Sequence, residues 1–342
     1  MSTEALPKRP ANSGAQFCPP QHHSPEGPTD PVNTKLPPNF TVLVAGGSRG
    51  IGLGIAQSYA LANVTNLIIS SRTLSTCEDA ARSIVKLNPR VKILCQECDV
   101  TSDQQVQDLV EAVRKGFGRL DVLVINAGSS TALTEVREGG LKDWPRGMIE
   151  GPSTELERLW KINVNAAFLL QHYFLPLLEE TRDGAQAVIQ IGSAAAHYID
   201  PEVMATSYRY VQYSSPFHPH LTTSKIPTQT SLTKFATTRQ IDHVHEAHHK
   251  NGIVAYCIQP GGVKTDLSNA VPEGKGWEKQ TKKKVLIDSP SLCGGFLVWL
   301  TKEKRQWLSG RYLDARWDIP TLLSKKEEIT SKDLLKLRMA LD

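Results

Sequence analysis

Three glycines in residues 42–52 form a pattern that suits the binding of a dinucleotide. The apolar run before Gly46 is typical of a strand, and the residues after Gly52 are typical of a helix. Glycine lets the chain turn tightly and lets a phosphate approach the backbone, and the free N–H groups at a helix start favour an anion. The sequence therefore predicts a nucleotide site at this turn, with contacts from Gly46, Ser48, Arg49, Gly50, Ile51 and Gly52.

The residues after the second expected strand indicate which dinucleotide binds. Ser70 and Ser71 are followed by Arg72, and no acidic residue stands there to accept a hydrogen bond from a ribose 2′-hydroxyl. An arginine at this place favours a 2′-phosphate instead, and Arg49 in the glycine turn adds a second guanidinium. The alternative is a pair of solvated surface arginines. We expect NADP(H) rather than NAD(H).

The elements that must position these residues alternate regularly along the chain. Strand-type runs cover 41–46, 66–71, 91–98, 120–126, 185–192, 253–259 and 310–314. Helix-period segments cover 50–62, 75–88, 102–117, 153–180, 230–250 and 290–301. Strands separated by helices predict βαβ units. The expected fold class is α/β, a doubly wound Rossmann-type parallel sheet with helices on both faces, formed by one domain over 39–318.

Three segments depart from this rhythm. Residues 1–38 are rich in proline and poor in apolar side chains, which predicts a disordered tail. Residues 197–229 hold several prolines and no clean period, so we expect an irregular insertion there. Residues 319–342 form an amphipathic C-terminal tail, expected to pack on the domain or on a partner.

Composition excludes several classes of protein. The 342 residues carry a net charge of +4 with no basic block, so we expect no nucleic-acid partner. No apolar run is long enough to span a membrane. Six scattered cysteines and no secretory signal favour a reduced compartment, so we expect a cytoplasmic protein.

Several short motifs, in order along the chain, resemble those of one enzyme family. They are the glycine turn beginning at Ala45, the pair Asp99-Val100, the run Asn126-Ala127-Gly128 and the loop from Pro260 to Thr265. Together they resemble the short-chain dehydrogenases/reductases, and the fungal members in particular. Ala45 stands where the family has threonine, and Ile125 stands where it has a first asparagine. The resemblance implies contacts of Asp99 and Val100 with the adenine side of NADP(H), and of Asn126, Val263 and Thr265 with the rest of the cofactor.

The same resemblance implies a catalytic set. Asn163 matches the asparagine that helps to hold a proton-relay water, and Ser193 matches the serine that polarises the substrate carbonyl. A helix cap and a strand-end serine are the simpler interpretations of these two residues. The family's lysine binds the cofactor ribose and lowers the pKa of a catalytic tyrosine. A small carbonyl or alcohol substrate, and a homodimer or homotetramer, are implied as well.

The tyrosine of this set has no match at its usual spacing. None of the eight tyrosines is followed by lysine four residues later. Two lysines compete for the family position: Lys225 follows Leu221 by four residues, and Lys234 follows Thr230 by four. Lys234 is 26 residues before Pro260, which suits one helix and one strand, so we prefer it as the catalytic and ribose-binding lysine.

Threonine cannot replace the phenol, because its hydroxyl is far less acidic and its side chain is shorter. Four tyrosines lie in the irregular segment, namely Tyr198, Tyr208, Tyr210 and Tyr213, and no pattern chooses among them. Either one of them folds back into the site, or activity has been lost, or the segment contains sequence absent from the native product. Two functions follow: an NADP(H)-dependent oxidoreductase acting on a small metabolite, plausible in secondary metabolism, or an impaired nucleotide-binding relative of such enzymes.

Two apparent metal motifs have simpler explanations. His245 and His249 have the spacing of a zinc-protease helix, but they stand at a helix end, where the dipole favours histidine. Cys95 and Cys98 lie in a strand, where residues three apart face opposite sides. We expect no metal site.

Overall fold

A seven-stranded parallel sheet forms the centre of the molecule. The computed structural model describes residues 14–129, 136–137, 140–141, 153–197, 228–266 and 286–339. The spatial order of the strands is β3-β2-β1-β4-β7-β8-β9. The strands are β1 (Thr41–Ala45), β2 (Asn66–Ser71), β3 (Lys92–Glu97), β4 (Val122–Ile125), β7 (Ala187–Ile191), β8 (Val254–Gln259) and β9 (Arg311–Asp314). The order reverses between β1 and β4, where Ala45 is in register with Ile125. In such sheets the crevice beyond this reversal is the usual place for a ligand.

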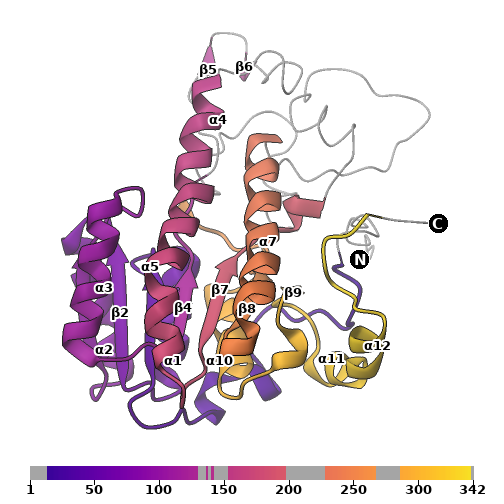
Figure 1. Cartoon of the computed structure of the whole chain (residues 1–342), viewed down its shortest axis with the longest axis horizontal. Coiled ribbons are helices and arrows are strands. Elements are labelled where there is room, and N and C mark those ends of the chain that lie inside the picture. Colours follow the sequence, from indigo (N-terminus) through magenta and orange to yellow (C-terminus); the bar gives the residue numbers. More distant parts are fainter. Residues whose placement is uncertain are drawn as a thin grey trace, which may run out of the picture.

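Helices cover both faces of the sheet (Figure 1). One face carries α1 (Gly50–Leu61), α2 (Leu74–Leu87) and α10 (Pro290–Thr301). The other carries α3 (Asp103–Phe117), α5 (Ala166–Glu180) and α7 (Thr228–His248). Two separate apolar cores result, one on each face of the sheet. The expected α/β class and doubly wound topology are confirmed.

The remaining elements are short. They are α4 (Ser153–Leu159), the π-helical turn η4 (Trp160–Asn165), η5 (Ala194–His197), η6 (His249–Asn251), η7 (Gln306–Leu308), α11 (Ile319–Ser324) and α12 (Lys326–Ser331), with the paired strands β5 (Val136–Arg137) and β6 (Gly140–Leu141). The expected strands differ from the observed ones by at most two residues at either end. The bounds could be predicted closely because buried strands have apolar sequences. In β1, for example, all five residues are buried and the last four are apolar.

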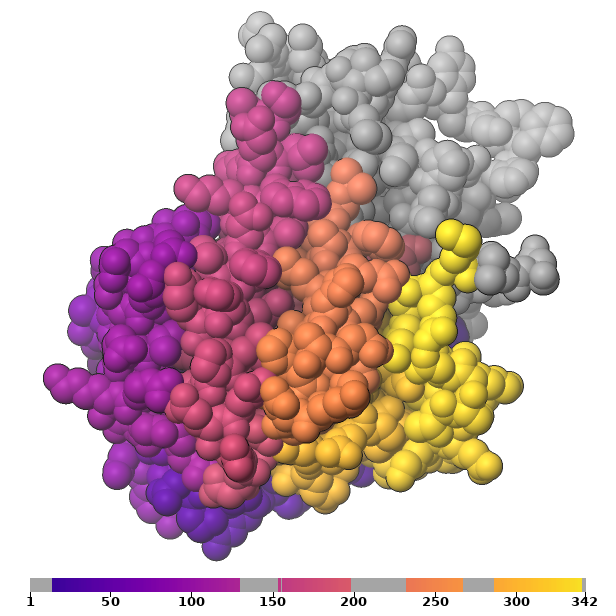
Figure 2. Space-filling view, viewed as in Figure 1, coloured from indigo at the N-terminus to yellow at the C-terminus, as the bar shows by residue number. Residues whose placement is uncertain are grey.

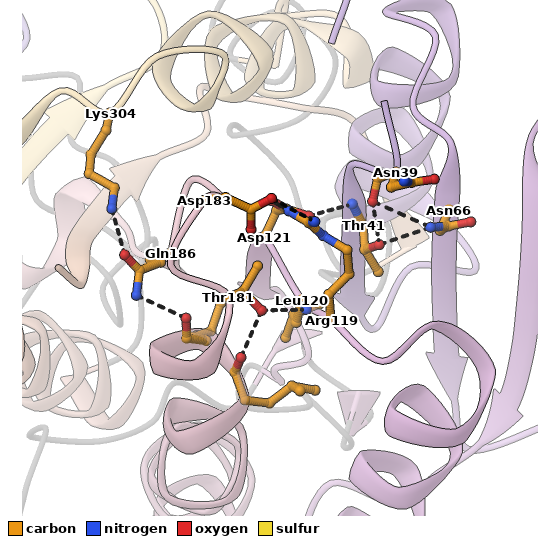
Figure 3. A network of polar contacts seen from close by, with 12 residues as sticks. Asn39, Thr41, Asn66, Arg119, Leu120, Asp121, Thr181, Asp183, Gln186 and Lys304 are labelled. Atoms are coloured by element: carbon orange, nitrogen blue, oxygen red, sulfur yellow. Dashed lines mark hydrogen bonds and ion pairs between the residues drawn. The ribbon is translucent and has the colours of Figure 1, made fainter. Parts of the chain in front are cut away.

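A polar network joins the elements at the amino ends of the central strands (Figure 3). The carboxylate of Asp121 accepts the backbone N–H of Thr41 at 2.8 Å and two guanidinium N–H groups of Arg119 at 2.9 and 3.1 Å. The Asp121 side chain is only 1% exposed, so these bonds replace its lost hydration. The network therefore fixes the edge of the sheet that lies opposite the glycine turn.

Residues 14–38 of the N-terminal segment are packed on the domain, so the expectation of a disordered tail is wrong for them. Cys18 and Leu36 are fully or almost fully buried, and the ring of Phe17 lies 5.5 Å from that of Trp317. The composition was misleading because the apolar partners of this segment belong to the C-terminal part of the chain. Residues 1–13 lie outside the described part.

The C-terminal segment packs on the domain. Ile329 of α12 is fully buried, and the guanidinium of Arg239 on α7 donates to the carbonyl of Leu337 at 2.8 Å. Figure 2 shows this segment against α7. Of the irregular insertion expected over 197–229, residues 198–227 lie outside the described residues, and 228–229 begin α7. None of the described helices is long and apolar enough to cross a membrane.

Candidate functional site

The glycine turn connects β1 to α1 as expected from the sequence. Gly46 has a φ of +80°, and a Cβ there would lie 2.8 Å from the backbone of Ala127. A Cβ on Gly52 would lie 2.1 Å from the carbonyl oxygen of Gly46. The turn thus has no room for side chains at these two positions, and the first N–H groups of α1 remain available for an anion. Ser48 and Ile51 are half-buried in the same turn.

A second loop, residues 260–266, contacts this turn. A Cβ on Gly50 would lie 3.2 Å from Cγ2 of Thr265, so the loop after β8 reaches the start of α1. Val263 is buried in the same loop. Arg49 donates to the carboxylate of Asp266 at 3.1 Å, and both side chains are 71% exposed. Such an exposed pair contributes about 1 kcal/mol or less, so a phosphate could replace Asp266 as the partner of Arg49.

The second cation lies at the end of the neighbouring strand. Arg72 follows β2, is exposed, and has no carboxylate paired with it among the described residues. The carboxyl end of β2 is hydrogen-bonded to that of β1, because Ser70 is in register with Ala45. Arg72 is therefore placed beside the glycine turn, as the sequence suggested.

The pair Asp99-Val100 lies in the loop between β3 and α3. The Asp99 carboxylate accepts hydrogen bonds from the backbone N–H and the hydroxyl of Thr101, both at 2.9 Å. The backbone N–H of Asp99 donates to the side-chain oxygen of Gln105 at 2.7 Å. These bonds turn the chain away from β3 into α3. Val100 is buried below them.

Asn126 and Asn163 both hold backbone next to the glycine turn. The Asn126 side chain donates to the carbonyl of Gly46 at 2.7 Å. The Asn163 side chain accepts from the N–H of Ser129 at 2.8 Å and donates to its carbonyl at 2.9 Å. It also donates to the hydroxyl of Thr233 at 3.0 Å, on α7.

Asn163 lies in the π-helical turn η4, between α4 and α5. A π-turn inserts an extra residue into a helix and often occurs at functional sites. Here it brings a nearly buried asparagine to both the β4 loop and α7. The sequence placed Asn163 on a helix but contained no signal for this local change.

Lys234, preferred for its spacing from Pro260, lies on α7. Its Nζ donates to the carbonyl of Ile191 at 2.8 Å, at the end of β7. A Cβ on Gly128 would lie 3.9 Å from this Nζ and 3.3 Å from Oδ1 of Asn163. Lys234 and Asn163 therefore converge on the loop after β4. Burial lowers the pKa of Lys234, because the charged ammonium loses hydration.

Ser193 comes two residues after Ile191, at the end of β7. It is half-buried, and its hydroxyl accepts the N–H of Ala195 at 3.2 Å. The next residue, Ala194, donates its N–H to the side chain of Gln259 at 2.9 Å. The sequence analysis missed Gln259, which ends β8 and is almost buried. Its only signal was a polar residue in an otherwise apolar strand.

Most of these side chains follow the carboxyl ends of parallel strands, and Asn163 on η4 and Lys234 on α7 reach the same region from helices. The arrangement combines a glycine turn at a helix start, two arginines, a buried ammonium and a hydroxyl. Lys225 and the four tyrosines of the insertion lie outside the described residues. The described residues contain no group of three or more His, Cys, Asp or Glu side chains that could hold a metal ion. The ring of His245 is hydrogen-bonded to the Ser309 hydroxyl at 2.8 Å, and that of His249 to the carbonyl of His245 at 2.9 Å.

Comparison with known proteins identifies the family. A family model described as short chain dehydrogenase matches residues 40–208. The short chain dehydrogenase pgmD of Aspergillus terreus is 31% identical over 340 residues, which is 98% of this chain and 97% of that protein. The chain belongs to the short-chain dehydrogenase/reductase family. Short chain dehydrogenase mpl6 of Monascus purpureus is 33% identical over 303 residues, 88% of each chain.

Solved structures of the family share the fold. A 7α-hydroxysteroid dehydrogenase complexed with NADH and 7-oxo-glycochenodeoxycholic acid superposes with a TM-score of 0.63 at 19% identity. The match covers 85% of this chain and 96% of that one. A short-chain dehydrogenase/reductase from Mycobacterium marinum gives a TM-score of 0.64 at 18% identity, over 84% and 97% of the two chains. The protein is thus an oxidoreductase of a family that uses NAD or NADP and acts on small molecules.

Proposed function

We propose that this protein is an NADP(H)-dependent oxidoreductase that interconverts a carbonyl and a secondary alcohol on a small metabolite, in secondary metabolism. One observation supports this most directly. The ammonium of Lys234 is held on the Ile191 carbonyl, two residues before Ser193, and faces the loop of Gly128. A buried ammonium is thus bonded to the end of the strand that Ser193 follows, which supports the proposed pairing of this lysine and this serine in one site.

The residues around the turn fit a phosphorylated dinucleotide. Positions 46 and 52 have no space for a Cβ, which leaves backbone N–H groups exposed to the pyrophosphate. Arg72 has no carboxylate partner within the described chain, and Arg49 has a weak one. Both guanidinium groups suit a 2′-phosphate. Asp99, Val100, Asn126, Val263 and Thr265 are proposed to complete the cofactor site.

The chain's own residues have distinct roles in the proposed reaction. When bound, the nicotinamide supplies or accepts the hydride. The Ser193 hydroxyl polarises the substrate oxygen by hydrogen bonding. Lys234 holds the cofactor ribose, and its ammonium favours the ionised form of a nearby acid. Asn163 keeps the backbone of η4 and the loop after β4 in place for a relay water.

A second candidate function follows from the residue four before Lys234. Thr230 lies in the first turn of α7, where the family has its tyrosine. Without a phenol the site binds the nucleotide but lacks a proton donor of suitable pKa. This alternative is a nucleotide-binding protein without turnover.

Two measurements separate these functions. NADPH affinity is followed by fluorescence titration, and turnover is followed by NADPH absorbance with a panel of ketones and quinones. Binding with turnover supports the enzyme, and Lys234→Met should then abolish turnover. Binding without turnover supports the alternative, and recovery of activity in Thr230→Tyr would locate the defect. Absence of NADPH binding contradicts both.

Assembly and location belong to the same proposal. Several large apolar side chains on the α4–α5 face and on α7 are exposed, namely Leu156, Trp160, Phe168, Leu232 and Phe235. Their burial between copies supports a homodimer or homotetramer, which light scattering after size-exclusion chromatography would test. All six cysteines are free thiols, which supports a cytoplasmic location.

A further inference from the structure

The ordered N-terminal segment crosses the side of the domain that carries the 260–266 loop. We define residues 14–36 as the strap. The strap begins at Gly14, whose carbonyl accepts from Nε1 of Trp317 at 3.0 Å, and it ends at Leu36, whose N–H donates to Ala62 at 3.1 Å. Between these ends, Pro25 and Thr29 pack closely on Gly295 of α10. A Cβ on Gly295 would lie 2.4 Å from the carbonyl oxygen of Thr29.

His23, in the middle of the strap, contacts a buried carboxylate. Its Nδ1 is 2.5 Å from Oδ1 of Asp288, whose side chain is only 2% exposed. The carbonyl of His23 also accepts the N–H of Ser289 at 2.8 Å. The strap is thus tied to residues 288–289 by both a side chain and the backbone.

The same carboxylate holds the 260–266 loop, whose Val263 and Thr265 are proposed to contact the cofactor. Oδ2 of Asp288 accepts the N–H of Gly262, and the N–H of Asp288 donates to the Gly262 carbonyl at 3.0 Å. Gly261 has a φ of +96°, and a Cβ there would lie 2.6 Å from the Asp288 carboxylate. One oxygen of Asp288 therefore fixes the loop, and the other is held by the strap.

We propose that His23 is a positioning residue, which orients Asp288 and thereby sets the 260–266 loop for cofactor binding. This inference rests on the proposed function for the identity of the ligand, but the contact itself does not. The two oxygens of the Asp288 carboxylate have different hydrogen-bond partners, His23 for Oδ1 and Gly262 for Oδ2. Removal of the imidazole takes the His23 bond away from a buried oxygen, so the carboxylate can rotate. The loop then samples positions in which Val263 and Thr265 no longer meet the glycine turn.

Three variants of the full chain test the proposal. His23→Ala removes the contact with Asp288, and His23→Asn keeps a donor at the place of Nδ1. His22→Ala is the matched control, because His22 belongs to the same strap but binds Asp318, at 3.1 Å, and not the loop. Circular dichroism and thermal melting establish that each variant is folded.

Two readouts follow. Hydrogen exchange of a peptide spanning 258–264 is measured without nucleotide, and NADPH affinity is measured by fluorescence titration. We expect His23→Ala to speed exchange in this peptide and to weaken NADPH binding about tenfold, the equivalent of one lost hydrogen bond of about 1.4 kcal/mol. His23→Asn should restore both, and His22→Ala should stay within about twofold of the wild type.

The outcomes distinguish the two proposals. Unchanged exchange at 258–264 in His23→Ala overturns the positioning role, whatever the nucleotide does. Equal effects of His22→Ala and His23→Ala also overturn it, because they would reduce the strap to a general stabiliser. If the wild type binds no NADPH, the proposed function fails, and the exchange experiment still decides the role of His23.

Discussion

Replacing Gly52 by alanine would test the packing on which the proposed cofactor site depends. A Cβ at this position would lie 2.1 Å from the Gly46 carbonyl and 2.6 Å from Nδ2 of Asn126, and real Cβ atoms do not approach within 3.0 Å. The Gly46 carbonyl would have to move by roughly 1 Å. That movement would break its 2.7 Å bond with Asn126.

The expected loss of stability follows from these two effects. Overpacking of a rigid site costs about 1–3 kcal/mol, and a lost hydrogen bond costs about 1 kcal/mol. Together they predict a loss of about 2–4 kcal/mol in the free energy of unfolding and, for a chain of this length, a fall of roughly 3–6 °C in melting temperature. NADPH affinity should fall by about tenfold or more, since the turn that exposes the N–H groups has moved.

Urea unfolding and fluorescence titration measure the two quantities. Gly116→Ala is the matched control, because Gly116 lies in α3 and a Cβ there meets no atom within 4 Å. This variant should gain up to about 1 kcal/mol, since alanine favours the helix. If Gly52→Ala unfolds and binds NADPH like the wild type, close packing at the turn does not shape the site and our reasoning is refuted.

Three further perturbations test separate parts of the molecule. Arg72→Ala should weaken NADPH binding about tenfold while NADH binding changes little, since the guanidinium is expected to pair with the 2′-phosphate; an equal loss for both nucleotides would contradict this. Burial lowers the pKa of His197 from 6.5 to about 4, so the unfolded chain binds a proton that the folded state excludes. The contribution of neutral His197 to the free energy of unfolding is fully present above pH 6.5, and about 3 kcal/mol of it is lost as the pH falls to 4. In urea unfolding, the free energy of His197→Gln should therefore decline less steeply over this pH range than that of the wild type. Identical pH profiles would refute the assignment. Asp121→Ala leaves the Thr41 amide and Arg119 without their buried partner, and should lower the free energy of unfolding by about 3 kcal/mol with NADPH affinity unchanged; a loss below about 1 kcal/mol would contradict the role of that network.

The sheet could be predicted from the sequence because most of its strands contain a short apolar run, as β1 and β4 do throughout residues 42–45 and 122–125. Ala45, Asn126 and Ser193 each end such a run, so their place at one edge of the sheet followed from the topology. Lys234 is preferred to Lys225 because its spacing from Pro260 suits one helix and one strand, and it lies on α7 with its Nζ bonded to Ile191. These are local patterns, or distances along one element.

Contacts between distant segments could not be predicted in the same way. The strap has the composition of a disordered tail, and only the position of Trp317 and Asp288 in space explains its order. The π-turn at Asn163 depends on packing against α7 and has no signature in the residues themselves. The partner of Arg49 is a carboxylate 217 residues away. No single sequence without an alignment contains that information.

The strap also determines when the molecule can finish folding. Gly14 leaves the ribosome long before Trp317, and the two residues joined by their hydrogen bond are 303 positions apart. The start of the strap must therefore wait, while β1 to β8 assemble, until the chain up to Trp317 has been synthesised. A nascent chain that stalls before residue 317 keeps Phe17 and Cys18 uncovered. The start of the strap is thus among the last parts of the described chain to reach its native place.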